Sequence, residues 1–88
     1  GVRIEFDDDK DRIDRAKHGL PLAAGYFVLA NSVHSTIDDR LDHGEERRID
    51  YGVVNGRLMV CVHTVRSGVH RIISVRKANR REQRRWLR

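Results

Sequence analysis

Cysteine is almost absent from this sequence, and long apolar runs are absent altogether. The lone Cys61 cannot form a disulfide within the chain, which fits a protein of a reducing compartment. A membrane-spanning helix needs about 20 apolar residues in a row, and no window approaches that length. The first residues also lack the pattern of a secretory signal peptide. We therefore expect a cytoplasmic protein that does not interact with membranes.

The sequence patterns of several enzyme classes are missing as well. We find no glycine-rich phosphate loop, no Walker pattern and no Gly-x-Ser-x-Gly element. Cys61 and His63 fall on one face of a predicted strand with His70 nearby, but no second pair completes the tetrahedral set that zinc requires. We therefore expect neither a metal site nor an organic cofactor. Cys61 is expected to be a small buried apolar side chain.

Internal repeats and linkers rich in proline or serine are also absent. The 88 residues therefore predict a single domain spanning residues 1–88. A chain this short buries only about 60–65% of the surface that its unfolded form exposes. Its core is small, so a partner protein can add to its stability.

What the sequence does have is positive charge concentrated at its C-terminal end. Residues 76–88 carry seven basic side chains and one acidic side chain, a net charge of +6. The whole chain has a net charge of +5, so the remainder sums to −1. Such a local field predicts a polyanion or an acidic protein as partner. The alternative is a solvated helix face, which six nearly unopposed arginines make less persuasive.

The pattern of apolar residues predicts a mixed set of strands and helices. Alternation predicts strands over 2–6, 47–54, 57–66 and 69–76, with a short one near 33–37. Helices are predicted over 10–18, 22–30 and 78–87. Two-residue turns at Asn55-Gly56 and Ser67-Gly68 link the last three strands into hairpins. The order predicts an α+β fold, with a small antiparallel meander, two N-terminal helices and one C-terminal helix.

The ends of the first helix are marked in the sequence. One of the aspartates at 7–9 can cap its N-terminus, and Gly19 can end it in the left-handed conformation. Ile13, Ala16 and Leu20 mark its narrow apolar face.

Two short elements point to a known family: Lys17-His18-Gly19, and Arg71-Ile72-Ile73-Ser74 followed by Arg76. Further residues fall in the order of the same family: Phe6-Asp7, Lys10, Ala23-Ala24, Phe27, Gly44-Glu45-Glu46-Arg47, Gly56-Arg57-Leu58, Thr64, Arg66, Ala78, Arg81 and Glu82. Over nearly its whole length the chain resembles the BrnT family of toxins. These are the ribonuclease halves of type II toxin–antitoxin modules.

The resemblance implies a RelE-like fold and cleavage of RNA without a metal ion. It also implies a BrnA-like ribbon-helix-helix antitoxin that neutralises the toxin, forms a heterotetramer with it and provides the only contact with DNA. Three residues depart from the family pattern. Phe6 stands where Trp is common, Leu22 where Phe is common and Trp86 where Tyr is common. Indole does not titrate, so Trp86 cannot replace a phenol that takes part in the chemistry.

Metal-independent RNA cleavage needs a base for the 2′-hydroxyl proton and cations for the phosphoryl oxygens. Alternation places Thr64 and Arg66 on one face of their strand, and Ile72, Ser74 and Arg76 on one face of the next. We expect Arg66 and Arg76 to converge with Thr64 and Ser74 on a polar site, which Arg47 can join. In this reading, the arginines bind the phosphate and stabilise the transition state. In the alternative, they are strand-end arginines paired with Glu45, Glu46 or Glu82.

Other candidates for the chemistry lie outside the arginine group. Lys17 or His18 can serve as general base or phosphate ligand, although cations that cap a helix C-terminus are at least as common. His43 is a weaker candidate base, because a solvated loop histidine explains it equally well. Glu82 is expected to form a structural salt bridge, and Trp86 is expected to belong to the core rather than to stack on a base.

The arginines of the last helix have two functional interpretations. Arg80, Arg81, Arg84 and Arg85 can follow an RNA backbone, or an acidic antitoxin can cover them, and both can hold in one protein. Two rival hypotheses use the same helix without catalysis. One is a basic nucleic-acid-binding module, and the other is an interaction protein that recruits an acidic peptide.

Overall fold

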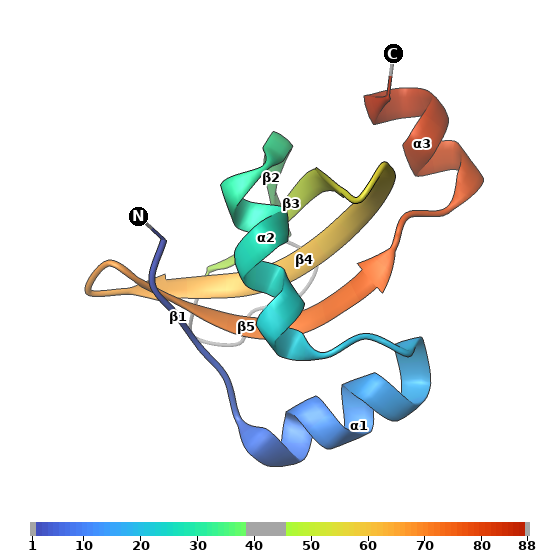
Figure 1. Cartoon of the computed structure of the whole chain (residues 1–88). Helices are drawn as coiled ribbons and strands as arrows, with labels where there is room; N and C mark the ends of the chain where they lie inside the picture. Colours follow the sequence, from blue (N-terminus) through green and yellow to red (C-terminus); the bar gives the residue numbers. More distant parts are fainter. Residues whose placement is uncertain (1, 39–45, 88) are drawn as a thin grey trace.

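A computed structural model describes residues 2–38 and 46–87 of the chain. Five strands and three α-helices follow one another, with a short 3-10 helix before the second α-helix (Figure 1). Their bounds are β1 Ile4–Glu5, α1 Asp8–His18, η1 Leu22–Ala24, α2 Gly25–Ala30, β2 Ser32–Asp38, β3 Arg47–Val54, β4 Arg57–Arg66, β5 Val69–Lys77 and α3 Arg80–Trp86. No helix of this part of the chain is long and apolar enough to cross a membrane.

The α+β prediction is confirmed, but the sheet is mixed rather than antiparallel throughout. Its strand order is β1-β5-β4-β3-β2, and β2 to β5 form the predicted antiparallel meander. The first strand instead pairs with β5 in parallel, and the amide of His70 donates to the carbonyl of Arg3 at 2.8 Å. The helical segment from α1 to α2 lies between β1 and the meander, and it carries the chain to the opposite edge of the sheet, where β2 begins. Because no tight turn links β1 to the meander, β1 can pair with β5 in the parallel direction.

Both predicted hairpin turns are confirmed by their backbone angles. Asn55 and Gly56 have φ values of 52° and 76°, and Ser67 and Gly68 have values of 52° and 78°. Two successive residues with positive φ match the twist of the strands that they join. These turns fix the register of β3 on β4 and of β4 on β5.

A bulge in β5 changes which of its side chains share a face. Val62 pairs with Ser74 while the next residue, His63, pairs with Ile72, so Ile73 is the extra residue. The sequence pattern placed Ile72 with Ser74 and Arg76, and this part of the prediction is wrong. Ile72 packs with Val75 in the core on one side of the sheet.

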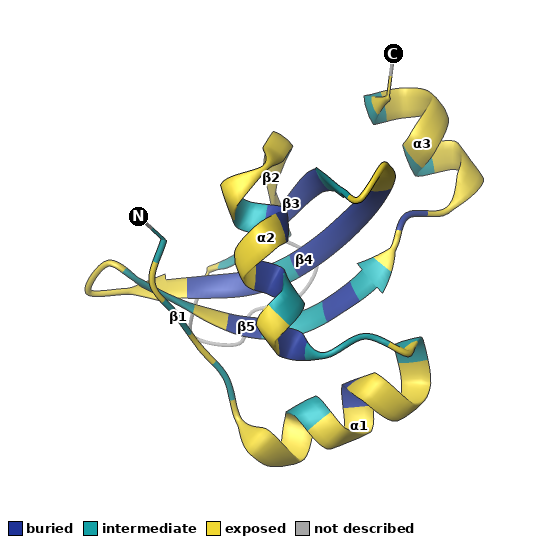
Figure 2. Ribbon diagram, in the orientation of Figure 1, coloured by how far each residue is buried: buried dark blue, intermediate teal, exposed yellow. Residues whose placement is uncertain are grey.

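Each side of the sheet carries its own apolar cluster. Figure 2 shows that buried residues line much of β4, in the middle of the sheet. On the side covered by η1 and α2, the buried residues are Leu22, Val28, Met59, Cys61, Ile72 and Val75. We call this side the α2 face. On the opposite side, which we call the α3 face, Tyr51, Leu58, Val60 and Ala78 pack with Trp86 of α3. Alternation along β4 separates Met59 and Cys61 from Leu58 and Val60.

The first helix docks through carboxylates rather than through the predicted apolar face. Asp11 Oδ1 accepts from the amide of Leu22 at 2.7 Å, and Asp14 Oδ2 accepts from the amide of Val75 at 3.2 Å. Of the predicted apolar face, Leu20 packs against the α2-face core, whereas Ile13 is 68% exposed. β5 offers unpaired amides at its outer edge beyond β1, and a carboxylate satisfies them where an apolar side chain cannot.

Candidate functional site

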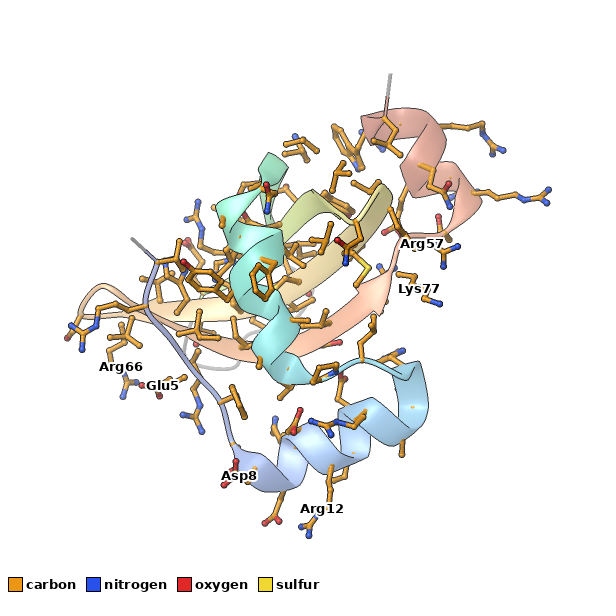
Figure 3. The ribbon with its side chains drawn as sticks, in the orientation of Figure 1. Glu5, Asp8, Arg12, Arg57, Arg66 and Lys77 are labelled. Atoms are coloured by element: carbon orange, nitrogen blue, oxygen red, sulfur yellow. The ribbon has the colours of Figure 1, made fainter. Side chains whose placement is uncertain are left out.

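The structure places Arg66 and Arg76 at opposite ends of the sheet. Arg66 pairs with Val69 beside the second hairpin turn, whereas Arg76 pairs with Val60. Arg76 is seven positions after Val69 along β5, roughly 23 Å at strand spacing. Figure 3 shows Arg66 near Glu5 at one end, and Lys77, the residue after Arg76, at the other. The expected convergence of the two arginines is therefore wrong. In this antiparallel pair, the end of β4 lies beside the start of β5, so Arg66 and the end of β5 that carries Arg76 are far apart.

Arg76 is instead engaged with Glu82 of α3. Its Nη1 and Nη2 donate to the two carboxylate oxygens at 2.8 and 2.9 Å. Glu82 also accepts from the amide of Asn79, whose side chain accepts from the amide of Glu82 in a capping box. The fork holds the pKa of Glu82 below its ordinary value and raises that of Arg76. Ser74 is two residues away on the same face, opposite Val62.

At the other end of the sheet, Arg66 lines two adjoining hollows. One, of about 560 Å³, is also lined by Glu46, Arg48, Val65 and His70. The other, of about 370 Å³, is also lined by Glu5, Thr64, Ser67, Val69 and Arg71. Thr64 therefore lies with Arg66 as predicted. Both volumes fall in the ~300–1,000 Å³ range of ligand sites, which is enough for a phosphate and its ribose.

The arginines of this end are held by weak, exposed contacts. Arg71 Nη1 lies 2.6 Å from Glu5 Oε2, and both side chains are about half exposed. Arg48 Nη1 lies 3.4 Å from Glu46 Oε1 in a similarly exposed pair. Such pairs contribute only about 0–1 kcal/mol, so an anionic ligand can replace the carboxylates. Arg47, the neighbour of Arg48 in β3, points by alternation to the α3 face, away from the larger hollow.

A buried chain of polar side chains ends in the larger hollow. Asp50 Oδ1 lies 2.7 Å from His63 Nε2, and His63 Nδ1 lies 3.1 Å from His70 Nδ1. His63 is 1% exposed, whereas His70 is half-buried and lines the hollow with Arg48 and Arg66. From the sequence alone, both histidines were candidates only as metal ligands. Asp50 is 13 residues from His63, and only the β3–β4 register brings them together.

Hydrogen bonds and burial set the protonation states of Asp50 and His70 in this polar chain. Burial acts to raise the pKa of Asp50, but hydrogen bonds from His63, Ser32 and Ser35 outweigh it and hold the pKa below its ordinary value. Asp50 is therefore an ionised carboxylate near neutral pH. Burial, with the charges of His63 and Arg48, lowers the pKa of His70 against the opposing effect of Asp50. His70 is therefore neutral near pH 7.

Lys17 and His18 lie on α1, away from these groups. Lys17 is exposed beside a shallow hollow that it shares with Ile73, and His18 Nε2 is 3.7 Å from Asp14 Oδ1. Gly19 has a φ of 75° and ends the helix as predicted. Neither side chain lines the two hollows at the Arg66 end as the described residues define them. His43 and Glu45 lie outside the described residues.

The last helix displays its arginines to solvent and packs its tryptophan inward. Trp86 stacks on His34 at 3.5 Å between ring centroids, lies 5.5 Å from Tyr51, and has the guanidinium of Arg85 over its ring at 4.9 Å. These contacts support a core role for Trp86. The exposed arginines of the helix are Arg80, Arg81, Arg84 and Arg85.

Cys61 has no feature of a metal ligand. It is fully buried in the α2-face core, and burial, with smaller effects of Asp50 and Asp14, raises its pKa to about 12. Within residues 2–38 and 46–87, no three or more His, Cys, Asp or Glu side chains are arranged to hold a metal ion.

The comparison with protein families decides the class. The family model for the ribonuclease toxin, BrnT, of type II toxin–antitoxin systems matches residues 6–82. The chain belongs to the BrnT family. No individual curated protein matches it significantly. As a BrnT family member it belongs to a group of ribonuclease toxins, and a type II system implies an antitoxin as partner.

The matched BrnT region includes every residue that lines the larger hollow at the Arg66 end and, apart from Glu5, every residue that lines the smaller one. It ends at residue 82, so Arg84, Arg85 and Trp86 lie beyond it. The departure at Trp86 therefore concerns a position outside the matched region.

Proposed function

We propose that this BrnT family member cleaves RNA without a metal ion, by attack of the ribose 2′-hydroxyl on the adjacent phosphorus at the Arg66 end of the sheet. The observation that carries the proposal is the position of Arg66 between two hollows. One hollow contains Arg48, and the other contains Arg71. Arg66 can thus bind a phosphate together with Arg48 on the α2 face of the sheet or with Arg71 on the α3 face.

Guanidinium groups suit this role because their fixed donor forks match phosphoryl oxygens and keep their charge at any relevant pH. Arg71 and Arg48 pair with exposed carboxylates, those of Glu5 and Glu46, which a phosphate can displace at small cost. Thr64, which is 7% exposed, adds a hydroxyl to the same hollow as Arg71. As negative charge builds on the phosphoryl oxygens, these donors stabilise it.

Arg76 and Glu82 act in this proposal as positioning residues that hold α3 against β5. The exposed arginines of α3 bind the flanking RNA backbone, since phosphate contacts need only cationic side chains on an accessible surface. A BrnA-like ribbon-helix-helix antitoxin covers the same helix with acidic side chains, in a heterotetramer that contacts DNA through the antitoxin alone. This arrangement would block the toxin directly.

The direct test is incubation of end-labelled RNA with the purified, antitoxin-free protein in excess EDTA. We expect fragments with 2′,3′-cyclic phosphate ends. Arg66→Gln is expected to lower the rate roughly 10²-fold, the effect of removing one transition-state donor. The control Arg57→Gln removes the same charge from the exposed first residue of β4 and is expected to keep the wild-type rate.

Intact RNA after incubation with the wild-type protein would overturn the enzyme proposal. If the same protein still bound RNA with a steep salt dependence, the non-catalytic nucleic-acid-binding module would take its place.

A further inference from the structure

The hydrogen bonds of the buried polar chain determine where its protons lie. An ionised carboxylate only accepts, so His63 Nε2 carries the hydrogen that Asp50 Oδ1 receives across 2.7 Å. The contact between His63 Nδ1 and His70 Nδ1, 3.1 Å apart, needs one donor and one acceptor. When His70 Nδ1 is the donor, His70 is in the tautomer whose Nε2 has a free lone pair.

We infer that His70 is the general base of the RNA cleavage proposed above, and that Asp50 and His63 are positioning residues that fix its tautomer. The inference rests on the proposed function. His70 lines the same hollow as Arg48 and Arg66, so a phosphate held by these arginines places its ribose beside the imidazole. A base within reach of the reacting hydroxyl and a cation at the phosphate are the two groups that the reaction needs.

The proposed step balances in atoms and charge. His70 Nε2 accepts the proton of the 2′-hydroxyl as the 2′-oxygen forms a bond to phosphorus. The bond from phosphorus to the 5′-oxygen breaks, and the leaving oxygen takes a proton from solvent water. The products are a 2′,3′-cyclic phosphate and a 5′-hydroxyl, and His70 returns its proton to water. While His70 is an imidazolium, its Nδ1–H still donates to His63, and the Asp50 carboxylate offsets the new charge.

Several groups face His70 and set the sign of its pH dependence. His63 and Arg66 come from β4, Asp50 and Arg48 from β3, and Glu46 lies beside Arg48. Only neutral His70 can accept a proton, so the cleavage rate must fall as the pH drops through its pKa. Burial foremost, then His63 and Arg48, place that pKa below the ordinary 6.5, and the acid limb of the rate profile should lie there.

The tautomer can be measured without any reaction. Long-range ¹H–¹⁵N correlation spectra of histidine-labelled, folded protein near neutral pH should show His63 with its hydrogen on Nε2 and His70 with its hydrogen on Nδ1. A His70 ring with its hydrogen on Nε2 would overturn the inference, since that nitrogen could not accept a proton. Spectral dispersion reports that the protein is folded.

The kinetic test uses single-turnover cleavage of a mixed-sequence RNA in EDTA. His70→Gln is expected to lower the rate about 10²-fold or more and to remove the acid limb. The control His34→Gln, which changes a half-buried histidine of β2 outside the hollow, is expected to keep that limb. Asp50→Asn should lower the single-turnover rate at saturating protein, leave the half-saturating protein concentration unchanged and move the limb to lower pH, because the carboxylate no longer favours the imidazolium.

The two proposals fail in different ways. If the wild-type protein leaves RNA intact, the proposed function fails. If the wild-type protein cleaves RNA and folded His70→Gln cleaves it at the same rate with the same pH profile, only the role of His70 fails.

Discussion

The Arg76 guanidinium and the Glu82 carboxylate form a two-pronged ion pair, with oxygen–nitrogen distances of 2.8 and 2.9 Å. The pair joins the end of β5 to the first turn of α3, and the same carboxylate completes the capping box of that helix. Few other contacts hold α3 to the rest of the described chain, apart from the packing of Trp86 on the α3-face core. Arg76 is thus a link within the fold, whereas Arg66 faces open hollows.

This relationship predicts a coupling between the two residues. Arg76→Gln and Glu82→Gln should each lower the free energy of unfolding by about 1–3 kcal/mol, because each leaves a partly buried charge without its partner. The double variant should lower the free energy of unfolding by less than the sum of the two single variants. Urea unfolding of the four proteins measures the coupling. Glu46→Gln is the matched control, since Glu46 is 58% exposed in its ion pair and Glu82 is 14% exposed in its own.

We expect the ionised Asp50 carboxylate to make the stability of the fold fall at acid pH. Its folded-state pKa is held below the ordinary 3.8, so its contribution to folding is present above that value and lost as the pH falls through the folded pKa. Asp50→Asn should therefore lower the free energy of unfolding by about 1–3 kcal/mol near neutral pH. The difference in this free energy between the variant and the wild type should become smaller at acid pH. Urea unfolding at a series of pH values checks this. A difference that is constant with pH would contradict the prediction.

We expect that replacing the Glu5 carboxylate increases the affinity for RNA. The Glu5 carboxylate forms an exposed ion pair with Arg71, and an RNA phosphate that binds Arg71 must displace this carboxylate. Glu5→Gln should lower the KM for RNA by up to about five-fold, which corresponds to the loss of a competing surface ion pair. Steady-state cleavage with the wild type as reference measures it. An increase in KM would mean that Glu5 orients Arg71 for the phosphate rather than competing with it.

The α3 arginines predict a change in salt dependence. Each phosphate contact on single-stranded nucleic acid contributes about 0.7 to the slope of log affinity against log salt. Arg81→Gln with Arg84→Gln should therefore reduce the slope by about one, while turnover at saturating RNA stays unchanged. Arg12→Gln with Arg57→Gln removes the same charge from exposed positions elsewhere and should leave the slope unaltered. Equal slopes for the two double variants would exclude α3 from RNA contact.

Local residue chemistry alone determined several features of this protein. The dipeptides Asn55-Gly56 and Ser67-Gly68 fixed both hairpins, and Gly19 fixed the end of α1, because each depends only on backbone angles that these residues adopt cheaply. The order of residues along the chain was enough to predict the BrnT family. The location of excess positive charge in residues 76–88 could also be read directly.

The tertiary structure alone decided which side chains meet. The bulge at Ile73 moved Ile72 to the α2 face, and antiparallel pairing put Arg66 and Arg76 at opposite ends of the sheet. The α1 helix docked through Asp11 and Asp14 because η1 and β5 offered the backbone amides of Leu22 and Val75 there. Register, bulges and strand direction depend on pairing between residues far apart in the chain, and no local pattern encodes them. For the same physical reason, the contact of Asp50 with His63 and of His63 with His70 appears only when β3, β4 and β5 are assembled.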